Sequence, residues 1–184
     1  MIVASIRAPA RSTHHDHGMR WLEMGRIGGM SWKPFLATGA ATTAAAVIGS
    51  VGTDPASSWY QGLNLPDWQP PGEVIGPVWT VLYASIAGAT GLAADRAGRG
   101  RRTRLAAILG LNLGLNAAWP WVFFRAHRLA LGVAVIAGLE ATTVALVREV
   151  GRTDRRAAAA LLPYLGWNLF AMTLNAAVAA RNHD

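Results

Sequence analysis

The sequence contains no cysteine. This absence excludes disulfide bonds, a thiol nucleophile and any metal site built on cysteine ligands. The HExxH motif of metalloproteases, the phosphate-binding loop of nucleotide enzymes and the GxSxG turn of serine hydrolases are also missing. With His127 alone near a helix end, we expect no metal centre and no required cofactor.

Charge is scarce inside the long apolar stretches, since only 15% of all residues are charged and 52% are hydrophobic. Each stretch has about 19 to 24 residues, and a helix needs ~20 to cross a hydrocarbon core. A soluble helix would carry a polar stripe, which these stretches lack. The sequence therefore predicts an all-α membrane protein, a bundle of five transmembrane helices at about 34–52, 74–94, 105–124, 129–147 and 157–180.

The net charge of +7 follows the predicted topology. If the first helix enters from the inside, 14 cationic residues lie on the inner side and 3 on the outer side, as the positive-inside rule requires. We therefore expect the N-terminus inside, the C-terminus outside and no nucleic-acid partner. The basic inner loops and the preference for arginine fit a bacterial plasma membrane.

The N-terminal residues 1–32 stand apart from the predicted membrane domain, 33–181. The first 18 residues are polar and lack the apolar core of a signal peptide. Two readings stay open, a disordered arm or a later start at Met19, Met24 or Met30. A metal site at His14, His15 and His17 is disfavoured against a mobile tail, because no framework positions these side chains.

The third apolar stretch has two different faces at 100° per residue. One is a stripe of small residues, which allow membrane helices to approach closely: Ala106, Gly110, Gly114 and Ala118. The opposite face is polar and aromatic: Asn112, Asn116, Trp119 and Phe123. We interpret the first face as a packing seam, for instance in a homodimer, and the second as a cavity wall. The alternative is that both faces pack inside one bundle.

Aromatic and amide side chains from three helices are predicted at similar depth, namely Trp79, Asn116, Trp119 and Trp167. Pro77, Pro120 and Pro163 would bend their helices and make room between them. A pocket of indole rings and amides suits a flat, largely apolar ligand. Each tryptophan taken alone is more often core filler or an interface anchor. Glu140 is the one ionisable residue deep in a membrane stretch, so it is a functional candidate, although a protonated, hydrogen-bonded carboxyl is the favoured reading.

The loop after the first helix is pinned by proline and rich in aromatic residues. It begins the first of three motifs, WYQGLNLPDWQPPG at 59–72 with PVWTVLY at 77–83. The second is NLGLNAAWP at 112–120, and the third is PYLGWNLFA at 163–171. With the five-helix plan, these motifs resemble the translocator protein or tryptophan-rich sensory protein (TspO/MBR) family over about residues 33–181.

The resemblance implies a five-helix bundle, often dimeric, with a ligand cavity under the first loop. Members of the family bind porphyrins and other hydrophobic molecules, and they are linked to tetrapyrrole transport or turnover, stress sensing and, in animals, cholesterol. By motif position, the ligand-contacting residues would be Tyr60, Pro70, Trp79, Asn116, Trp119, Trp167 and Ala171. Some members are reported to degrade protoporphyrin in light with two tryptophans, which match Trp79 and Trp167.

Two departures from the family pattern concern the ligand. The loop lysine common before the proline is Leu65 here, which removes a cation that could meet porphyrin propionates. After Tyr164 the next cation is Arg181, so the weak cholesterol motif is absent and sterol is the less favoured ligand. We expect a binding protein for a porphyrin or haem-type tetrapyrrole, acting in transport or sensing. The alternatives are light-dependent porphyrin degradation and a membrane signalling scaffold.

Overall fold

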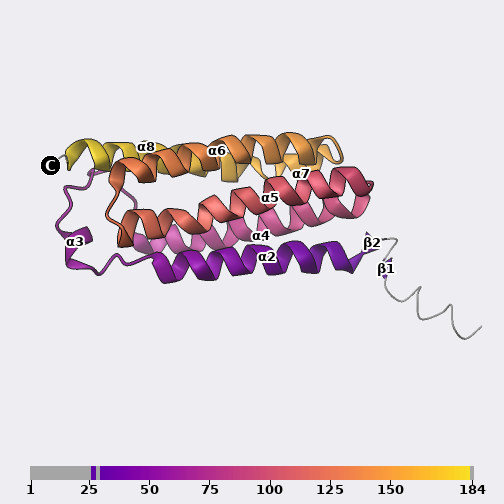
Figure 1. Cartoon of the computed structure of the whole chain (residues 1–184), viewed down its shortest axis with the longest axis horizontal. Coiled ribbons are helices and arrows are strands. Elements are labelled where there is room, and N and C mark those ends of the chain that lie inside the picture. Colours follow the sequence, from indigo (N-terminus) through magenta and orange to yellow (C-terminus); the bar gives the residue numbers. More distant parts are fainter. Residues whose placement is uncertain (1–25, 28–29, 183–184) are drawn as a thin grey trace, which may run out of the picture. The chain divides into compact units, whose positions relative to one another are not determined.

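The structure, a computed structural model, describes residues 26–27 and 30–182 (Figure 1). The chain divides into two units between Trp32 and Lys33. The first contains a short antiparallel pairing of β1 (Arg26–Ile27) with β2 (Met30–Ser31), which the sequence did not predict. The three histidines considered as metal ligands lie outside the described residues.

The helices of the described chain are α2 (Trp32–Gly52), α3 (Ser58–Gln61), α4 (Gly72–Arg96), α5 (Arg99–Pro120), the π-helical turn η1 (Trp121–Arg125), α6 (Leu129–Gly151), α7 (Arg155–Ala159) and α8 (Leu162–Arg181). They supply five spans that are long and apolar enough to cross a membrane. The predicted five-helix fold is therefore confirmed. Several helices extend further than predicted, because the arginine-rich ends remain helical beyond the apolar stretch; α5 begins at Arg99, six residues before the predicted start.

The fifth span is interrupted, whereas the sequence predicted one continuous helix. A turn at Ala160 and Leu161 separates α7 from α8. Pro163 lies in the first turn of α8, a position where its missing N–H removes no helical hydrogen bond. The proline therefore starts a new helix instead of bending an existing one.

The short helix α7 is capped by Asp154, whose carboxylate accepts hydrogen bonds from the backbone N–H groups of Arg156 and Ala157. The Arg96 guanidinium at the end of α4 also pairs with this carboxylate. The Ala157 N–H above all, with the Arg156 N–H and Arg96, holds the pKa of Asp154 below its usual range. The link therefore joins the α6–α7 turn to α4 at what we call the basic end of the bundle.

The third span ends in a π-helical turn directly after Pro120. Pro120 lacks the N–H that would bond to the Asn116 carbonyl. In the turn after it, a hydrogen bond of 2.8 Å runs from the Ala126 N–H to the Trp121 carbonyl. Two consecutive aromatic side chains, Phe123 and Phe124, are both buried there. The turn thus presents a broad aromatic surface at the opposite end of the bundle, which we call the loop end.

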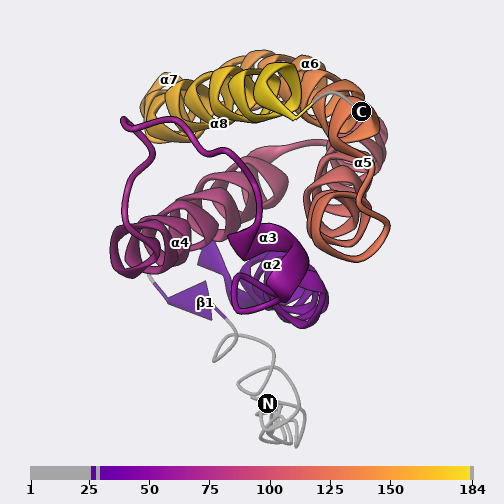
Figure 2. The same ribbon diagram turned by 90° about the vertical axis from the view of Figure 1, so that its left-hand side faces the viewer.

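The segment 53–71 crosses the loop end. Figure 2 looks onto this end and shows the segment leaving α3, passing toward α8 and returning to the start of α4. Ser57 caps α3, since its side chain accepts a hydrogen bond from the Tyr60 N–H. The segment is therefore an ordered cover over the ends of the helices, and the sequence predicted such a lid without its helical turn.

Helix α2 contacts different partners at its two ends. Near its start, a Cβ added to Gly91 of α4 would lie 2.7 Å from the Phe35 ring, and the Thr38 hydroxyl donates to the Ala87 carbonyl at 2.9 Å. Near its end, a Cβ added to Gly49 would lie 3.7 Å from Pro120 of α5. Helix α2 therefore packs against α4 near its start and against α5 near the loop end.

Candidate functional site

A buried network of amides and hydroxyls joins four helices. The Tyr164 hydroxyl of α8 donates to Asn112 Oδ1 at 3.0 Å and accepts from Asn116 Nδ2 at 3.1 Å. The Tyr83 hydroxyl of α4 donates to Asn116 Oδ1 at 2.5 Å. Asn112 Nδ2 continues the network to the Thr143 hydroxyl of α6 at 2.9 Å. Buried polar groups are costly unless they are paired, so this network fixes how the helices face one another.

A second polar link lies closer to the loop end. Trp119 Nε1 donates to Asn175 Oδ1 at 2.8 Å, and Asn175 Nδ2 donates to the Leu129 carbonyl at 3.2 Å. Gly132 of α6 gives the amide its space, because a Cβ there would lie 2.8 Å from Asn175 Oδ1. The link holds the Trp119 ring in one orientation against α8.

Six aromatic rings form what we call the Trp79 cluster: Trp68, Trp79, Tyr83, Tyr164, Trp167 and Phe170. Trp79 of α4 is central, with ring centroids 5.4 Å from Tyr83 and 6.5 Å from Trp167 of α8, the latter at an interplanar angle of 89°. Trp167 lies 5.4 Å from Phe170, which meets Trp68 of the 53–71 loop at 5.8 Å. The cluster therefore connects α4 and α8 to the loop that covers them.

A second group, the Phe123 cluster, lies under the start of the loop and consists of Trp59, Tyr60, Trp119, Phe123, Phe124 and His127. Trp119 stacks on Phe123 at 5.0 Å, and Tyr60 lies 5.1 Å from Phe124. Trp59 stacks on the His127 ring at 4.1 Å, where His127 has a φ of 56°. The sequence gave no indication of this stacking, since Trp59 and His127 share neither a motif nor a helix.

The middle of the loop is pinned to the end of α8. The Asn64 N–H donates to Asn182 Oδ1 at 2.8 Å, and Asn182 Nδ2 donates back to the Asn64 carbonyl at 3.2 Å and to the Val178 carbonyl at 2.8 Å. Sequence reasoning missed this anchor, because an asparagine just past a helix end is common and carries no spacing pattern.

The structure divides four of the predicted ligand residues between the two aromatic clusters and places the other three outside them. Trp79 and Trp167 belong to the Trp79 cluster, whereas Tyr60 and Trp119 belong to the Phe123 cluster. Asn116 is buried, and both polar atoms of its amide bond to tyrosines of the Trp79 cluster. Pro70 and Ala171 are half-buried, on the loop and on α8 respectively.

Trp167 carries a buried donor without a partner. Its indole Nε1 finds no hydrogen-bond acceptor among residues 26–27 and 30–182, although the ring as a whole is only half-buried. An unpaired buried donor costs about 1–3 kcal/mol. This atom is therefore a buried polar group of the Trp79 cluster that a bound molecule could satisfy.

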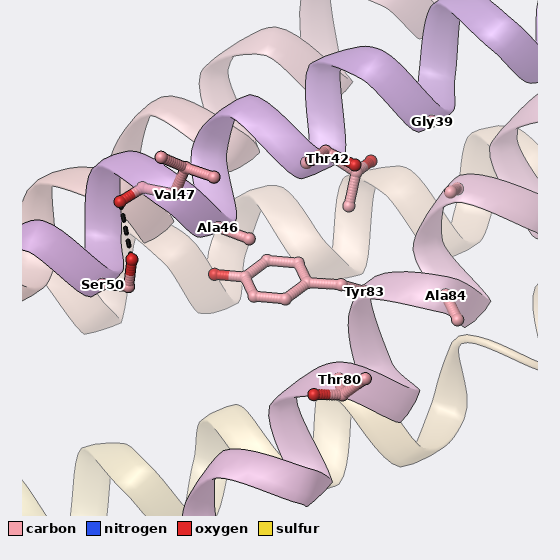
Figure 3. Close-up of a pocket in the computed structure, with 10 residues that line it drawn as sticks. Gly39, Thr42, Ala46, Val47, Ser50, Thr80, Tyr83 and Ala84 are labelled. Carbon is pink, nitrogen blue, oxygen red and sulfur yellow. Dashed lines mark hydrogen bonds between the residues drawn. The ribbon is translucent and has the colours of Figure 1, made fainter.

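A cavity of about 500 Å³ lies between α2 and α4 (Figure 3). We call it the α2–α4 groove, and its lining includes Gly39, Thr42, Ala46, Ser50, Thr80, Tyr83 and Ala84. The sequence predicted a cavity at the tryptophans, but Trp79, Trp119 and Trp167 are not among the lining residues. Tyr83 is the residue that belongs both to the groove and to the Trp79 cluster.

The small-residue stripe of α5 faces away from the other helices. Ala106, Gly110 and Gly114 are exposed, Ala118 is half-buried, and a Cβ at either glycine would meet no atom of the described chain within 4 Å. On the other face, Asn112 and Asn116 are buried. The stripe therefore remains open to lipid or to a second copy of the chain.

Two further sequence expectations concern ionisable groups. Glu140 of α6 is half-buried, and its Oε2 has no hydrogen-bond partner among the residues that the structure describes. No group of three histidine or acidic side chains able to hold a metal ion occurs in the described part of the chain.

Comparisons with known proteins agree with this architecture. The TspO/MBR family model matches residues 37–181. The human translocator protein is 37% identical over 68% of this chain and 75% of its own length. A tryptophan-rich sensory protein from Cereibacter sphaeroides is 33% identical over 79% of this chain and 89% of its own length. A tryptophan-rich protein TspO from Archaeoglobus fulgidus is 34% identical over 68% and 80%.

The matched region contains four of the five apolar spans, the first span from residue 37 onward, the 53–71 loop and both aromatic clusters. Length, hydropathy, motif order and sequence identity thus agree, and the chain is an integral multi-pass membrane protein that belongs to the TspO/MBR family.

Proposed function

We propose that this protein binds porphyrin-like tetrapyrroles at the Trp79 cluster, for transport or for sensing in the membrane. The unpaired Nε1 of Trp167 is the observation that carries the proposal, because a tetrapyrrole offers acceptor atoms within a large flat apolar ring. Indole and phenol rings suit such a surface through stacking and edge contacts. The names of the relatives, translocator protein and tryptophan-rich sensory protein, support a role in transport or sensing.

The loop decides how a ligand would reach the cluster. Trp68 covers Phe170, and Trp79 and Trp167 are half-buried, so each keeps an accessible ring face. A macrocycle would contact these faces after Trp68 moves aside with the loop. The binding step would therefore replace the Trp68–Phe170 contact with contacts to the ligand.

The charge of the loop should also determine which porphyrin side groups are preferred. The segment 53–71 has no lysine or arginine, and Leu65 stands where the family resemblance implies a lysine. Propionate groups would therefore find no loop cation. We expect the dimethyl ester of protoporphyrin to bind at least as well as the free acid.

The test is a titration of the purified protein with protoporphyrin, followed by porphyrin absorbance and by quenching of tryptophan fluorescence. Trp79→Ala and Trp167→Phe should each raise Kd about tenfold, as expected for the loss of ~1.4 kcal/mol. Trp32→Phe is the matched control, since Trp32 is 48% exposed at the start of α2. Equal affinity in the unmodified protein and all three variants would rule out the Trp79 cluster as the binding site.

Light-dependent porphyrin degradation is a second candidate function. The indoles of Trp79 and Trp167 are perpendicular, with centroids 6.5 Å apart. An excited porphyrin could take an electron from one of these indoles and pass it to dioxygen, which becomes superoxide. The indole radical left behind would then regain its electron by oxidising the porphyrin. Trp79→Phe and Trp167→Phe should then lower the yield of oxidised product per bound porphyrin. Bleaching of free porphyrin at the same rate without protein would remove this function.

The proposed orientation places the N-terminus and the basic end inside a bacterial plasma membrane and the loop outside. The absence of cysteine makes a clean test available. Gln61→Cys on the loop and Gly98→Cys at the basic end are both exposed positions. A membrane-impermeant maleimide added to whole cells should label the first variant and spare the second until the cells are opened. The reverse pattern would overturn the orientation.

A further inference from the structure

The α2–α4 groove is bounded by contacts at both ends of α2. At one end, the Thr38 hydroxyl meets the Ala87 carbonyl at 2.9 Å. At the other, Trp121 Nε1 of η1 donates to the Ile48 carbonyl at 2.9 Å. On α2 the lining runs from Gly39, directly after the first contact, to Ser50, just past the second, and a cavity of about 500 Å³ remains there between α2 and α4.

The groove has the length of one membrane leaflet. Its lining on α2 runs from Gly39 to Ser50, and these positions span about 16 Å at 1.5 Å per residue. This is roughly half of the ~30 Å hydrocarbon core. Ser50 lies two residues before the end of α2, so the groove belongs to the half of the bundle at the loop end.

Four of the five hydroxyl groups that line the groove donate to protein acceptors, and that of Thr43 has no hydrogen bond among the described residues. Ser50 Oγ donates to the Val47 carbonyl at 2.8 Å, and the Thr80 hydroxyl donates to the Gly76 carbonyl at 3.2 Å. The Tyr83 hydroxyl donates to Asn116 Oδ1. These groups leave mainly methyl and aromatic carbon facing the groove, which contrasts with the unpaired indole donor of Trp167.

The groove is open on its flank. Val47 is 56% exposed, and Thr80 and Ala84 are also exposed. In a chain that spans the bilayer, this flank is continuous with the surface that lipid covers. A groove that is apolar, one leaflet long and open to lipid fits a hydrocarbon chain.

We propose that the α2–α4 groove holds one hydrocarbon chain of a membrane lipid, from the leaflet at the loop end. This site differs from the Trp79 cluster, and Tyr83 alone is common to both. In Figure 3, the Tyr83 ring extends from α4 toward α2, and its hydroxyl donates to Asn116 of α5. The bound chain therefore packs against the face of Tyr83 that the tryptophans leave free.

A helix from a second copy of the chain fits the groove less well. An α-helix with its side chains is about 10–12 Å across and would run along the whole of α2. At its Thr38 end the groove is closed by the contact of α2 with α4. A single flexible chain can end inside such a space, whereas a helix cannot.

The test uses the full chain in lipid nanodiscs that contain a phosphatidylcholine with a diazirine on one acyl chain. After photolysis, mass spectrometry should find labels at 39–50 and 80–87 at least fivefold above those on the lipid-facing side of α6. Ala84→Trp fills the groove from an exposed position and should reduce these labels to the α6 level. Ala134→Trp, an exposed position of α6, is the matched control and should leave them unchanged.

The unmodified protein alone can overturn the proposal, whether or not the variants fold. Uniform labelling of all lipid-facing helices would mean that the groove holds only passing lipid. Cross-links from a photoreactive residue at Val47 to a second copy of the chain would mean that a protein surface occupies it. Labelling confined to the groove and lost in Ala84→Trp is the result that supports a seated hydrocarbon chain.

Discussion

Gly132 of α6 and Asn175 of α8 approach each other so closely that a Cβ at Gly132 would lie 2.8 Å from Asn175 Oδ1. The same oxygen accepts the hydrogen bond from Trp119 Nε1. The glycine therefore lets an amide cross the helix interface and hold an indole ring beside the 53–71 loop. Packing at one glycine thus controls the orientation of a residue in the Phe123 cluster.

Gly132→Ala should displace the Asn175 amide and break its bond with Trp119. We expect a loss of about 1–3 kcal/mol, typical of overpacking in a tight interface, against the gain of up to ~1 kcal/mol that alanine brings to a helix. Gly138→Ala is the matched control on the same helix, since its Cβ would meet only Leu115 at 3.5 Å. Thermal unfolding in detergent should show a lower Tm for the first variant. Equal Tm values would mean that the Asn175 link does not contribute to stability.

Tyr164→Phe should destabilise the bundle core. The substitution leaves Asn112 Oδ1 and Asn116 Nδ2 without the hydroxyl that joins them. An unsatisfied buried polar group costs about 1–3 kcal/mol, and Tyr164 is fully buried. Tyr60→Phe removes a hydroxyl that pairs with Gln69 in the half-exposed loop, so its effect should be clearly smaller. A larger effect for Tyr60→Phe would contradict the role assigned to the buried network.

The five spans were predictable, because uninterrupted apolar length alone distinguishes a membrane helix. The break at Ala160 and Leu161 was not, since the apolar composition continues unchanged through it. A proline such as Pro163 can bend a helix or begin one. In this chain Asp154 caps the separate short helix α7, and Pro163 begins the next helix, α8.

For the candidate site, the sequence predicted on which helix face a residue lies, but not which residues it contacts. Helical periodicity correctly placed Asn112 and Asn116 on one face of α5 and Gly110 and Gly114 on the other. It could not tell that the amide of Asn116 bonds to tyrosines, because periodicity gives a face and not a partner. The division of the tryptophans between two clusters, and the α2–α4 groove, depend on how helices cross.

Acid should weaken the link at Asp154. The pKa of this carboxyl is lower in the folded protein than its usual value of about 3.9. Its contribution to stability is therefore fully present above about pH 4 and is lost as pH falls through the lower folded value. Asp154→Asn keeps a capping oxygen but no charge, so it should be less stable at neutral pH and respond less to acid. Asp67→Asn, exposed on the loop, is the control, and the measurement is Tm between about pH 2 and 7. An unchanged acid response in Asp154→Asn would mean that the Asp154 carboxylate does not cause the acid sensitivity.

The exposed stripe of α5 makes a prediction about assembly. If the protein is a homodimer through this face, Gly110→Leu and Gly114→Leu should convert it to a monomer, because the helices could no longer approach closely. Gly166→Leu is the matched control, since Gly166 is exposed on α8 and a Cβ there also meets no described atom within 4 Å. Light scattering with detergent correction gives the mass. A dimer that persists in both α5 variants must use another face.

Asn182 should control how readily the 53–71 loop opens. Asn182→Ala removes both hydrogen bonds to the Asn64 backbone and the bond to the Val178 carbonyl. At a net ~0.5–1.5 kcal/mol per bond, hydrogen exchange at the Asn64 amide should accelerate by about tenfold or more. Asn64→Ala is the matched control, because it keeps the N–H and the carbonyl that Asn182 binds.

If the loop covers the Trp79 cluster, porphyrin association should also be faster in Asn182→Ala and unchanged in Asn64→Ala. Faster exchange with unchanged association would mean that the Trp68–Phe170 contact, and not the Asn182 anchor, limits access.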